Sequence, residues 1–315
     1  MNRIGDLGFL VGMLLILVSF GTLSFQEFFG QLHSSSTAVT TSTYNWIALC
    51  LFIGATGKSA QIPLYTWLPD AMAGPTSVSA LIHAATMVTA GIYMICRSNV
   101  LFALAPQTLN IVLIVGVATS LFAAVIGLKQ NDIKKVLAYS TVSQLGLMFA
   151  ALGIGAFESG MFHVVTHAFF KALLFLGAGS VIHAMGGEQD LRKMGGLRSY
   201  IKITYITFII RTLAISGIFP FAGFFSKDEI LAASFADHKL VWGILSFSCM
   251  LTAFYMFRLY FLTFGTSFRG TERQKHHLHE SSATMTIPLM VLAGLSIVGG
   301  LMGLPMVMSH THLFA

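Results

Sequence analysis

The chain has 315 residues, of which 55% are hydrophobic and 10% are charged. Soluble domains carry about 25% charged residues, so the composition excludes a water-soluble globular protein and predicts an integral helical membrane protein. The net charge of +6 is explained by the position of the basic residues in loops, and we expect no nucleic-acid partner.

Nine stretches each approach the roughly 20 apolar residues that a helix needs to cross a bilayer. Lipid admits only helices and closed barrels, and these runs are too long and continuous for barrel strands. The predicted fold class is therefore all-α, a polytopic membrane helical bundle. In chain order the predicted spans are 4–25, 44–69, 76–97, 109–128, 135–156, 160–184, 203–224, 239–264 and 284–308.

The basic residues are distributed unequally between the two sides of the predicted bundle. The side that holds the N-terminus carries twelve lysines and arginines and the opposite side carries two, a bias typical of cytoplasmic loops. We therefore expect a cytoplasmic N-terminus, with the C-terminal SHTHLFA on the other side. The twelve are Arg3, Lys129, Lys134, Lys135, Arg192, Lys193, Arg198, Lys202, Arg258, Arg269, Arg273 and Lys275, and the two are Arg97 and Lys239.

Two of the predicted spans are interrupted by proline and glycine. The second contains Pro63 and Pro69 and the seventh contains Pro220, and an interior proline removes a helical hydrogen bond. Broken helices at membrane depth are tolerated where they are buried in protein or line a water-filled cavity. The two lie five spans apart and so cross in opposite directions, which predicts an inverted repeat of five helices.

The repeat predicts how the chain is organised. One translocation domain, 1–315, would contain the remainder of a first repeat in 1–97, a second repeat in 98–264, and a loop with the final span in 265–315. Two helices of the first repeat are missing, so we expect the natural protein to begin before Met1.

The stretch FHVVTHAFFKALLFLGAG, residues 162–179, carries three protonatable side chains in an apolar helix. His163, His167 and Lys171 are four residues apart, so they share one face in a line about 12 Å long. Histidine titrates near neutral pH, and a lysine in an apolar interior can lose its proton, so the line predicts a segment of a proton path. The alternatives are histidines that cap neighbouring carbonyls, or a zinc site. The spacing lacks the glutamate of HExxH and a third ligand, so no metal is predicted.

Lys58 precedes the first proline break. A lysine at the centre of a membrane helix costs roughly 2.5–3.5 kcal/mol on insertion scales, which predicts a functional role or a tightly bound carboxylate. Asp6 and Asp70 fall near span ends, so we expect the partner of Lys58 to lie outside this sequence. His83, in SALIHAATMVTAG, is either a satisfied core histidine or a relay between the two lysine-bearing helices.

Two charged clusters lie at the ends of spans. Lys227, Asp228 and Glu229 follow the second break and predict either an exit gate for protons or an interfacial charge cluster at a helix start. Asp132 and Lys134, in KQNDIKKVLAYST, mark the start of another span and predict either proton intake or a topology signal.

Motifs for redox cofactors are not found in the sequence. Cys50, Cys96 and Cys249 are scattered without a CxxC pair, and there is neither a GxGxxG fingerprint nor a Walker loop. The loop RQKHHLHE, residues 273–280, has the residue types of a metal site, but its mixed charges favour a solvated loop.

Four long stretches resemble the antiporter-like subunits of respiratory complex I, and most of all its L-type subunits, the counterparts of mitochondrial subunit 5. They are GKSAQIPLYTWLPDAMAGPTSVSALIHAATMVTAGIY, DIKKVLAYSTVSQLG, FHVVTHAFFKALLFLGAGSVIH and GIFPFAGFFSKDEI. The resemblance implies a proton-translocating subunit of NADH:quinone oxidoreductase in the bacterial inner membrane. It also implies that flavin, iron–sulfur clusters and quinone bind other subunits, and that the partners are other membrane subunits, especially another antiporter-like one.

The resemblance also assigns expected roles to residues. It implies that Lys58 is the lysine of a broken helix, with Asp6 as an acid near it, and that His83 is a relay histidine. It implies that the central relay consists of His163, His167 and Lys171, and that Lys227 and Asp228 form an exit site supported by Glu229. It also implies that Asp132 and Lys134 are a pair on the cytoplasmic side.

The chain departs from the family pattern in three respects. The upstream helix with the glutamate that pairs with Lys58 is missing, the long lateral C-terminal helix is missing, and Arg211 stands where the family usually has a small residue. We therefore expect a fragment, a split gene or a chain without N- and C-terminal parts. The alternative functions are a membrane subunit of a multisubunit cation/proton antiporter or bicarbonate-uptake complex, and a non-functional remnant.

Overall fold

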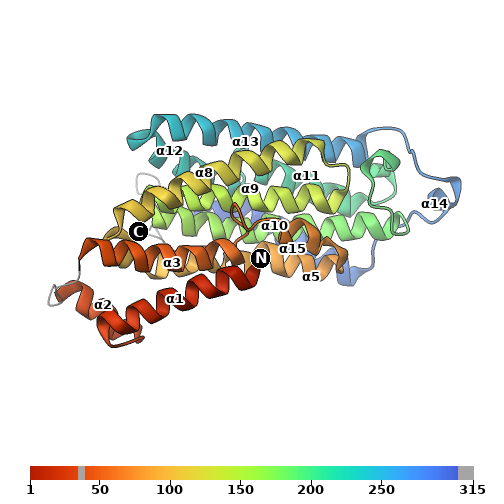
Figure 1. Cartoon of the computed structure of the whole chain (residues 1–315). Coiled ribbons are helices and arrows are strands. Elements are labelled where there is room, and N and C mark those ends of the chain that lie inside the picture. Colours follow the sequence, from red (N-terminus) through yellow and green to blue (C-terminus); the bar gives the residue numbers. More distant parts are fainter. Residues whose placement is uncertain (35–39, 304–315) are drawn as a thin grey trace.

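The computed structural model describes residues 1–34 and 40–303, and within them it is almost entirely helical. The only β-type pairing in this part of the chain is an isolated antiparallel bridge between Asp132 and Asp190. The axes of the long helices are roughly aligned, and the helices form one bundle (Figure 1). The all-α prediction is confirmed, while residues 304–308 of the last predicted span and the SHTHLFA tail lie outside the described residues.

The helices follow one another closely along the chain. The α-helices are α1 (Asn2–Phe20), α2 (Phe25–Ser34), α3 (Thr41–Lys58), α4 (Trp67–Asp70), α5 (Thr76–Ala84), α6 (Ala90–Arg97), α7 (Asn99–Ala103), α8 (Pro106–Lys129), α9 (Ile133–Gly153), α10 (Phe157–Ala184), α11 (Lys202–Ser216), α12 (Ala222–Asp237), α13 (Lys239–Tyr260), α14 (Glu272–His276) and α15 (Ala283–Val298). The short 3-10 turns are η1 (Ala71–Ala73), η2 (Met87–Thr89), η3 (Leu191–Lys193), η4 (Leu197–Ser199) and η6 (Gly299–Gly303), and η5 (Phe261–Gly265) is a π-helical turn.

Seven helical stretches in the described residues are long and apolar enough to cross a membrane. The two predicted spans that are not among the seven are the two interrupted ones, and their pieces are α3 with α4 and α11 with α12. The seven are Asn2–Phe20, Thr76–Arg97, Pro106–Lys129, Ile133–Gly153, Phe157–Ala184, Lys239–Gly265 and Ala283–Gly303.

Both predicted interruptions are present. In the second span, helix α3 ends at Lys58 and the chain is non-helical until α4. In the seventh, α11 ends at a left-handed Gly217 (φ 75°), a conformation that glycine adopts without steric cost. Each interruption contains a cis X–Pro bond, Ile62–Pro63 in the first and Phe219–Pro220 in the second.

A further interruption, in the third span, was not predicted. Helix α5 ends at Ala84, and the 3-10 turn η2 separates it from α6. The hydroxyl of Thr89 donates to the carbonyl of Ala85 at 2.7 Å, and that of Thr86 donates to Leu81 at 2.8 Å. Threonine hydroxyls that bond to nearby carbonyls offer the backbone an alternative to the helical pattern, and the interruption lies directly after His83.

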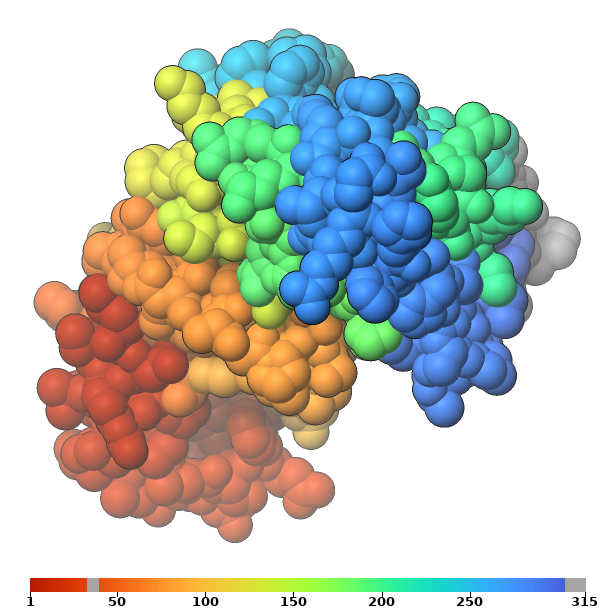
Figure 2. All heavy atoms as spheres, turned by 90° about the vertical axis from the view of Figure 1, so that its right-hand side faces the viewer, coloured from red at the N-terminus to blue at the C-terminus, as the bar shows by residue number. Residues whose placement is uncertain are grey.

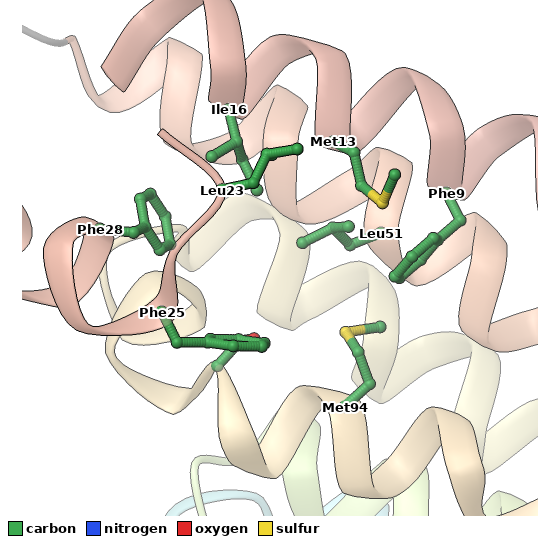
Figure 3. Close-up of a pocket in the computed structure, with 9 residues that line it drawn as sticks. Phe9, Met13, Ile16, Leu23, Phe25, Phe28, Leu51 and Met94 are labelled. Carbon is green, nitrogen blue, oxygen red and sulfur yellow. The ribbon is translucent and has the colours of Figure 1, made fainter. Parts of the chain in front are cut away.

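The first predicted span is shorter than expected and is followed by an unpredicted helix. Helix α1 ends at Phe20 because Gly21 takes a left-handed conformation (φ 71°). Helix α2 then lies beside the bundle (Figure 1), and Phe28 from it packs edge-on against Phe20 with ring centroids 4.9 Å apart. An apolar cavity of about 180 Å³ lies between α1, α2, α3 and α6 (Figure 3). It is lined by Phe9, Met13, Ile16, Leu23, Phe25, Phe28, Leu51, Met94 and Ser98.

Helix α9 is the most deeply buried of the seven spanning stretches. It crosses α8 closely at two glycines, because a Cβ placed on Gly116 would lie 2.9 Å from the Gly146 carbonyl oxygen. Small residues allow membrane helices to approach in this way. Helix α10 packs against α9 and also against α5, α11, α12 and α15, so the polar groups in its middle are enclosed by protein.

Three of the loops between spans gather at one end of the bundle, which we call the basic end. It comprises residues 130–132, 185–201 and 266–282. Figure 2 faces this end and shows the segment after α13 lying against the segment between α10 and α11.

Candidate functional site

The three protonatable residues of α10 are completely buried. His163, His167 and Lys171 each have 0% of their surface exposed, and the two imidazole rings have centroids 6.3 Å apart. The predicted line of three groups on one helical face is therefore present within the core of the bundle.

His163 is held by two side chains from other helices. Its Nε2 lies 3.2 Å from Oε1 of Gln144 on α9, and its Nδ1 lies 2.8 Å from the hydroxyl of Ser226 on α12. A carbonyl oxygen of an amide only accepts, so Nε2 carries the proton and Nδ1 of the neutral ring accepts from Ser226. His163 thus connects α10 to the residue next to Lys227.

His167 is oriented by the interruption of the third span. Its Nδ1 donates to the main-chain carbonyl of Ala84 at 3.0 Å, a carbonyl near the end of α5, where the helical bonding pattern stops. In the neutral ring Nε2 is then the unprotonated nitrogen. No described residue provides a hydrogen-bond partner for it, so it is available to accept a proton.

Lys171 has a neutral partner. Its Nζ donates to the hydroxyl of Ser140 on α9 at 2.8 Å. Among the ion pairs of the described residues, none includes Lys171, Lys227 or Arg211. A buried ammonium without a carboxylate is costly, and the hydroxyl of Ser140 can bond to the charged or to the neutral form of the amine.

His83 is buried beside this line but is not bonded to it. Its side chain is 1% exposed, and its ring lies 5.3 Å from the ring of Phe175 on α10, centroid to centroid. Its Nδ1 has no hydrogen-bond partner within the described chain. The structure brings His83 against α10, and a direct bond to a relay group is not formed.

The expectation that Lys58 has its carboxylate outside this sequence is wrong. Nζ of Lys58 lies 3.0 Å from Oδ1 of Asp6, and their side chains are 40% and 39% exposed. Lys58 is the last residue of α3, where this span is interrupted, and it lies level with Asp6 in α1. The helices meet at glycines, since a Cβ on Gly57 would lie 2.9 Å from Cα of Gly5, and this contact brings the two charges together.

The three charged residues after the second break, Lys227, Asp228 and Glu229, lie in three different environments. Lys227 is 3% exposed, and its ammonium donates to the carbonyl of Ile215 near the end of α11. Asp228 is exposed, whereas Glu229 is half-buried and accepts from the hydroxyl of Ser159 at 3.1 Å. Of the three, only Lys227 is adjacent to Ser226 and hence to His163.

Asp132 and Lys134 lie at the basic end but do not pair through their side chains. The Asp132 carboxylate caps α9 by accepting from the main-chain N–H groups of Lys134 at 2.8 Å and Lys135 at 3.1 Å. The Lys134 ammonium is buried and donates to the carbonyl of Gly74 at 3.0 Å. The carboxylate therefore stabilises a helix start, and the lysine ties α9 to the segment after α4.

Arg211, whose presence in a predicted span the sequence did not explain, is fully buried in α11. Its Nη1 donates to the carbonyls of Leu173 at 2.7 Å and Leu174 at 2.6 Å on α10. Its guanidinium carbon lies 2.9 Å from the ring centroid of Phe208. Gly177 leaves the space, because a Cβ at that position would overlap the guanidinium.

The side chains that hold the α10 line were not predicted from the sequence. Ser140, Gln144 and Ser226 are polar residues within buried helices, a pattern that also occurs in structural positions. The sequence feature that could have identified them is their location, because each lies in a stretch that already contains a candidate lysine or aspartate.

Comparison with known proteins identifies the family. Residues 1–254 match the family described as NADH:quinone oxidoreductase/Mrp antiporter, TM. The chain belongs to this family. It is 51% identical to NADH-quinone oxidoreductase subunit L of Campylobacter jejuni, over 93% of this chain and 48% of that protein. It is 48% identical to NAD(P)H-quinone oxidoreductase chain 5 of a Picosynechococcus strain, over 96% of this chain and 50% of that protein.

The fold is also similar to that of a solved structure. A chain in the Mrp complex from a Dietzia species matches 97% of this chain with a TM-score of 0.81 and 30% identity, and the match covers 33% of that chain. Our chain spans about half the length of the curated relatives it matches. Membership of the NADH:quinone oxidoreductase/Mrp antiporter family agrees with the resemblance that the sequence motifs indicated.

Proposed function

We propose that this chain translocates protons as an antiporter-like membrane subunit of NADH:quinone oxidoreductase. The observation that supports this most is the buried line of His163, His167 and Lys171, whose hydrogen-bond partners are all neutral. Neutral partners let each group gain and lose a proton, whereas a carboxylate would favour the charged form.

In this proposal the path runs from the Asp6–Lys58 pair past His83 to Lys171, then along α10 to His163, Ser226 and Lys227. Asp228 and Glu229 would receive protons beyond Lys227, and Asp132 and Lys134 would support the path at the basic end. Separations of about 6 Å along α10 are bridged by one or two waters.

The coupling would be electrostatic. A change of one unit charge at about 10 Å, with an effective dielectric constant of about 20, alters the energy of a second charge by roughly 1.7 kcal/mol. This is more than a tenfold change in the proton-binding equilibrium constant. A change in the Asp6–Lys58 pair would therefore bias whether Lys171 holds its proton.

The redox chemistry would take place in other subunits. The proposal places flavin, iron–sulfur clusters and quinone there, and gives this chain no redox cofactor. The chain would be a multi-pass protein of the bacterial inner membrane, with a cytoplasmic N-terminus and another antiporter-like subunit as its neighbour.

The test is Lys171→Ala in the assembled enzyme, in membrane vesicles oxidising NADH. We expect fewer protons translocated per NADH, with assembly retained. The matched control is Lys129→Ala, because Lys129 is an exposed lysine at the end of α8. An unchanged proton-to-NADH ratio in an assembled Lys171→Ala enzyme would contradict the proposal.

A second candidate is a subunit of a cation/proton antiporter without electron transfer. The similarity of fold to a chain of the Mrp complex favours it. Vesicles that hold the assembled complex distinguish the two functions. NADH-driven proton uptake supports the first, and sodium-driven proton movement without NADH supports the second.

A further inference from the structure

Arg211 has more hydrogen-bond donors than the surrounding protein satisfies. Its side chain is 0% exposed, and Nη1 alone bonds to main-chain carbonyls. The Nε and Nη2 groups have no partner among the described residues. Buried donors of a charged group are nearly always bonded to protein or to ordered water, so the unpaired donors of Arg211 indicate bound water.

Arg211 lies on a polar line along one face of α11. Thr204, Thr207, Arg211 and Ile215 are spaced three or four residues apart, so they share this face. Thr204 and Thr207 are buried, and the carbonyl of Ile215 accepts from the ammonium of Lys227. The line extends about 16 Å, and its neighbouring members are separated by about 4.5–6 Å along the axis, a distance that one water bridges.

The outer end of the line is a carboxylate at the basic end. Oε1 of Glu280 accepts from the hydroxyl of Thr204 at 2.7 Å, and Thr204 in turn lies 2.7 Å from the hydroxyl of Ser180 on α10. The hydroxyl of Ser281 lies 2.7 Å from that of Ser180. Because the Thr204 hydroxyl donates its hydrogen bond to the carboxylate, it accepts one from Ser180. The hydroxyl protons of Ser281, Ser180 and Thr204 therefore all point along this row towards Glu280.

We propose that bound waters fill this face of α11 from Glu280 to Lys227, with Arg211 as the residue that holds them, and that they give Lys227 proton access from the basic end. The inference rests on the proposed function, because it adds an intake route to the same relay. The loop that carries Glu280 lies at the end of the bundle seen in Figure 2, where solvent reaches the half-buried carboxylate.

Each transfer step along the route conserves protons. A hydronium ion from the solvent protonates Glu280 and becomes water, the carboxylic acid then gives a proton inward, and each hydroxyl or water receives one proton as it releases one. The last water gives its proton to the neutral amine of Lys227. Arg211 remains protonated throughout and acts as a positioning residue.

The competing explanation is that Glu280 only caps α11, since its Oε2 also accepts from the main-chain N–H of Ile203 at 2.8 Å. Glu280→Gln separates the two, because the amide oxygen retains the cap but the side chain no longer titrates. Glu272→Gln is the control, because Glu272 is an exposed carboxylate in the same loop. We expect proton translocation in the assembled complex to fall about tenfold in Glu280→Gln and to be unchanged in Glu272→Gln.

Hydration is tested separately from pumping by thiol labelling in the assembled complex, after replacement of Cys50, Cys96 and Cys249. Thr207→Cys should react with a small, membrane-impermeant thiol reagent added at the basic end. The expected rate is about ten times that of Thr263→Cys, a fully buried threonine nearer the same end but off the line. Adding Arg211→Met should slow the labelling of Thr207→Cys towards the control rate.

The outcomes distinguish the two proposals. If Lys171→Ala translocates normally, the proposed function is wrong, while labelling still reports on the route. If Lys171→Ala stops translocation, the proposed function remains. The intake route is then wrong if Glu280→Gln translocates like Glu272→Gln, or if Thr207→Cys labels no faster than Thr263→Cys.

Discussion

Replacing Gly57 with alanine tests how α1 and α3 bring Asp6 to Lys58. The added Cβ would lie 2.9 Å from Cα of Gly5, whereas carbon atoms in contact are about 3.5–4.0 Å apart. The helices must therefore separate by about 0.6–1 Å at the crossing. Overpacking of this kind costs about 1–3 kcal/mol, and we expect the free energy of unfolding to fall by this amount.

The separation should also weaken the ion pair. The distance between Nζ of Lys58 and Oδ1 of Asp6 is 3.0 Å, and a similar displacement brings it to about 4 Å, beyond hydrogen-bond range. For a partly exposed pair the loss is about 0.2–1 kcal/mol, so the helix crossing accounts for most of the effect. A further substitution, Asp6→Asn, should consequently destabilise the Gly57→Ala protein less than it destabilises the original one.

The assay is denaturant unfolding in detergent micelles for both single variants and the double variant. Gly294→Ala is the control, because a Cβ on Gly294 in α15 would meet nothing within 4 Å. There the helix preference of alanine predicts a gain of up to about 1 kcal/mol. The reasoning is refuted if Gly57→Ala is as stable as Gly294→Ala and the effect of Asp6→Asn is the same in both backgrounds.

Three further predictions concern groups outside the α10 line. Asp132→Ala should lower the free energy of unfolding by about 1 kcal/mol and Asp132→Asn should not, because only the cap matters; equal denaturant midpoints would contradict this. The Arg192 side chain holds the pKa of the Asp190 carboxyl at about 2, below its usual value near 3.9. Pepsin cleavage of loop 186–193 should therefore increase as pH falls from about 4 to about 2, and a flat profile would contradict it. Gly177→Ala should destabilise the protein by about 1–3 kcal/mol through overlap with Arg211; Arg211→Ala should relieve this, and additive losses in unfolding energy would refute it.

The spans and two of their interruptions were predictable from local sequence. A run of about 20 apolar residues has few alternatives in a bilayer, and Pro63 and Pro220 each remove a helical hydrogen bond. The third interruption was not predictable in this way, because Thr86 and Thr89 also occur in regular membrane helices. It depends on their hydroxyls bonding to carbonyls of the preceding turn.

The candidate site was predictable as far as it lies on one helix. The spacing of His163, His167 and Lys171 determines their common face without knowledge of the fold. The pairing of Asp6 with Lys58 depends instead on two helices that meet at glycines 52 residues apart, Gly5 and Gly57. Hydropathy places span ends only approximately, so it could not show that Lys58 ends α3 at the level of Asp6.

Helix breaks connect these features, because they supply acceptors that carry no charge. Where α5 ends, the carbonyl of Ala84 holds His167, and where α11 ends, that of Ile215 holds Lys227. A carbonyl accepts a hydrogen bond from a protonated or a neutral amine, so it positions the group without fixing its charge. Lys58 is held differently, by the carboxylate of Asp6. The proposed path therefore begins at an ion pair and continues through residues whose partners are neutral, so a change at the first pair would act on groups that no carboxylate holds.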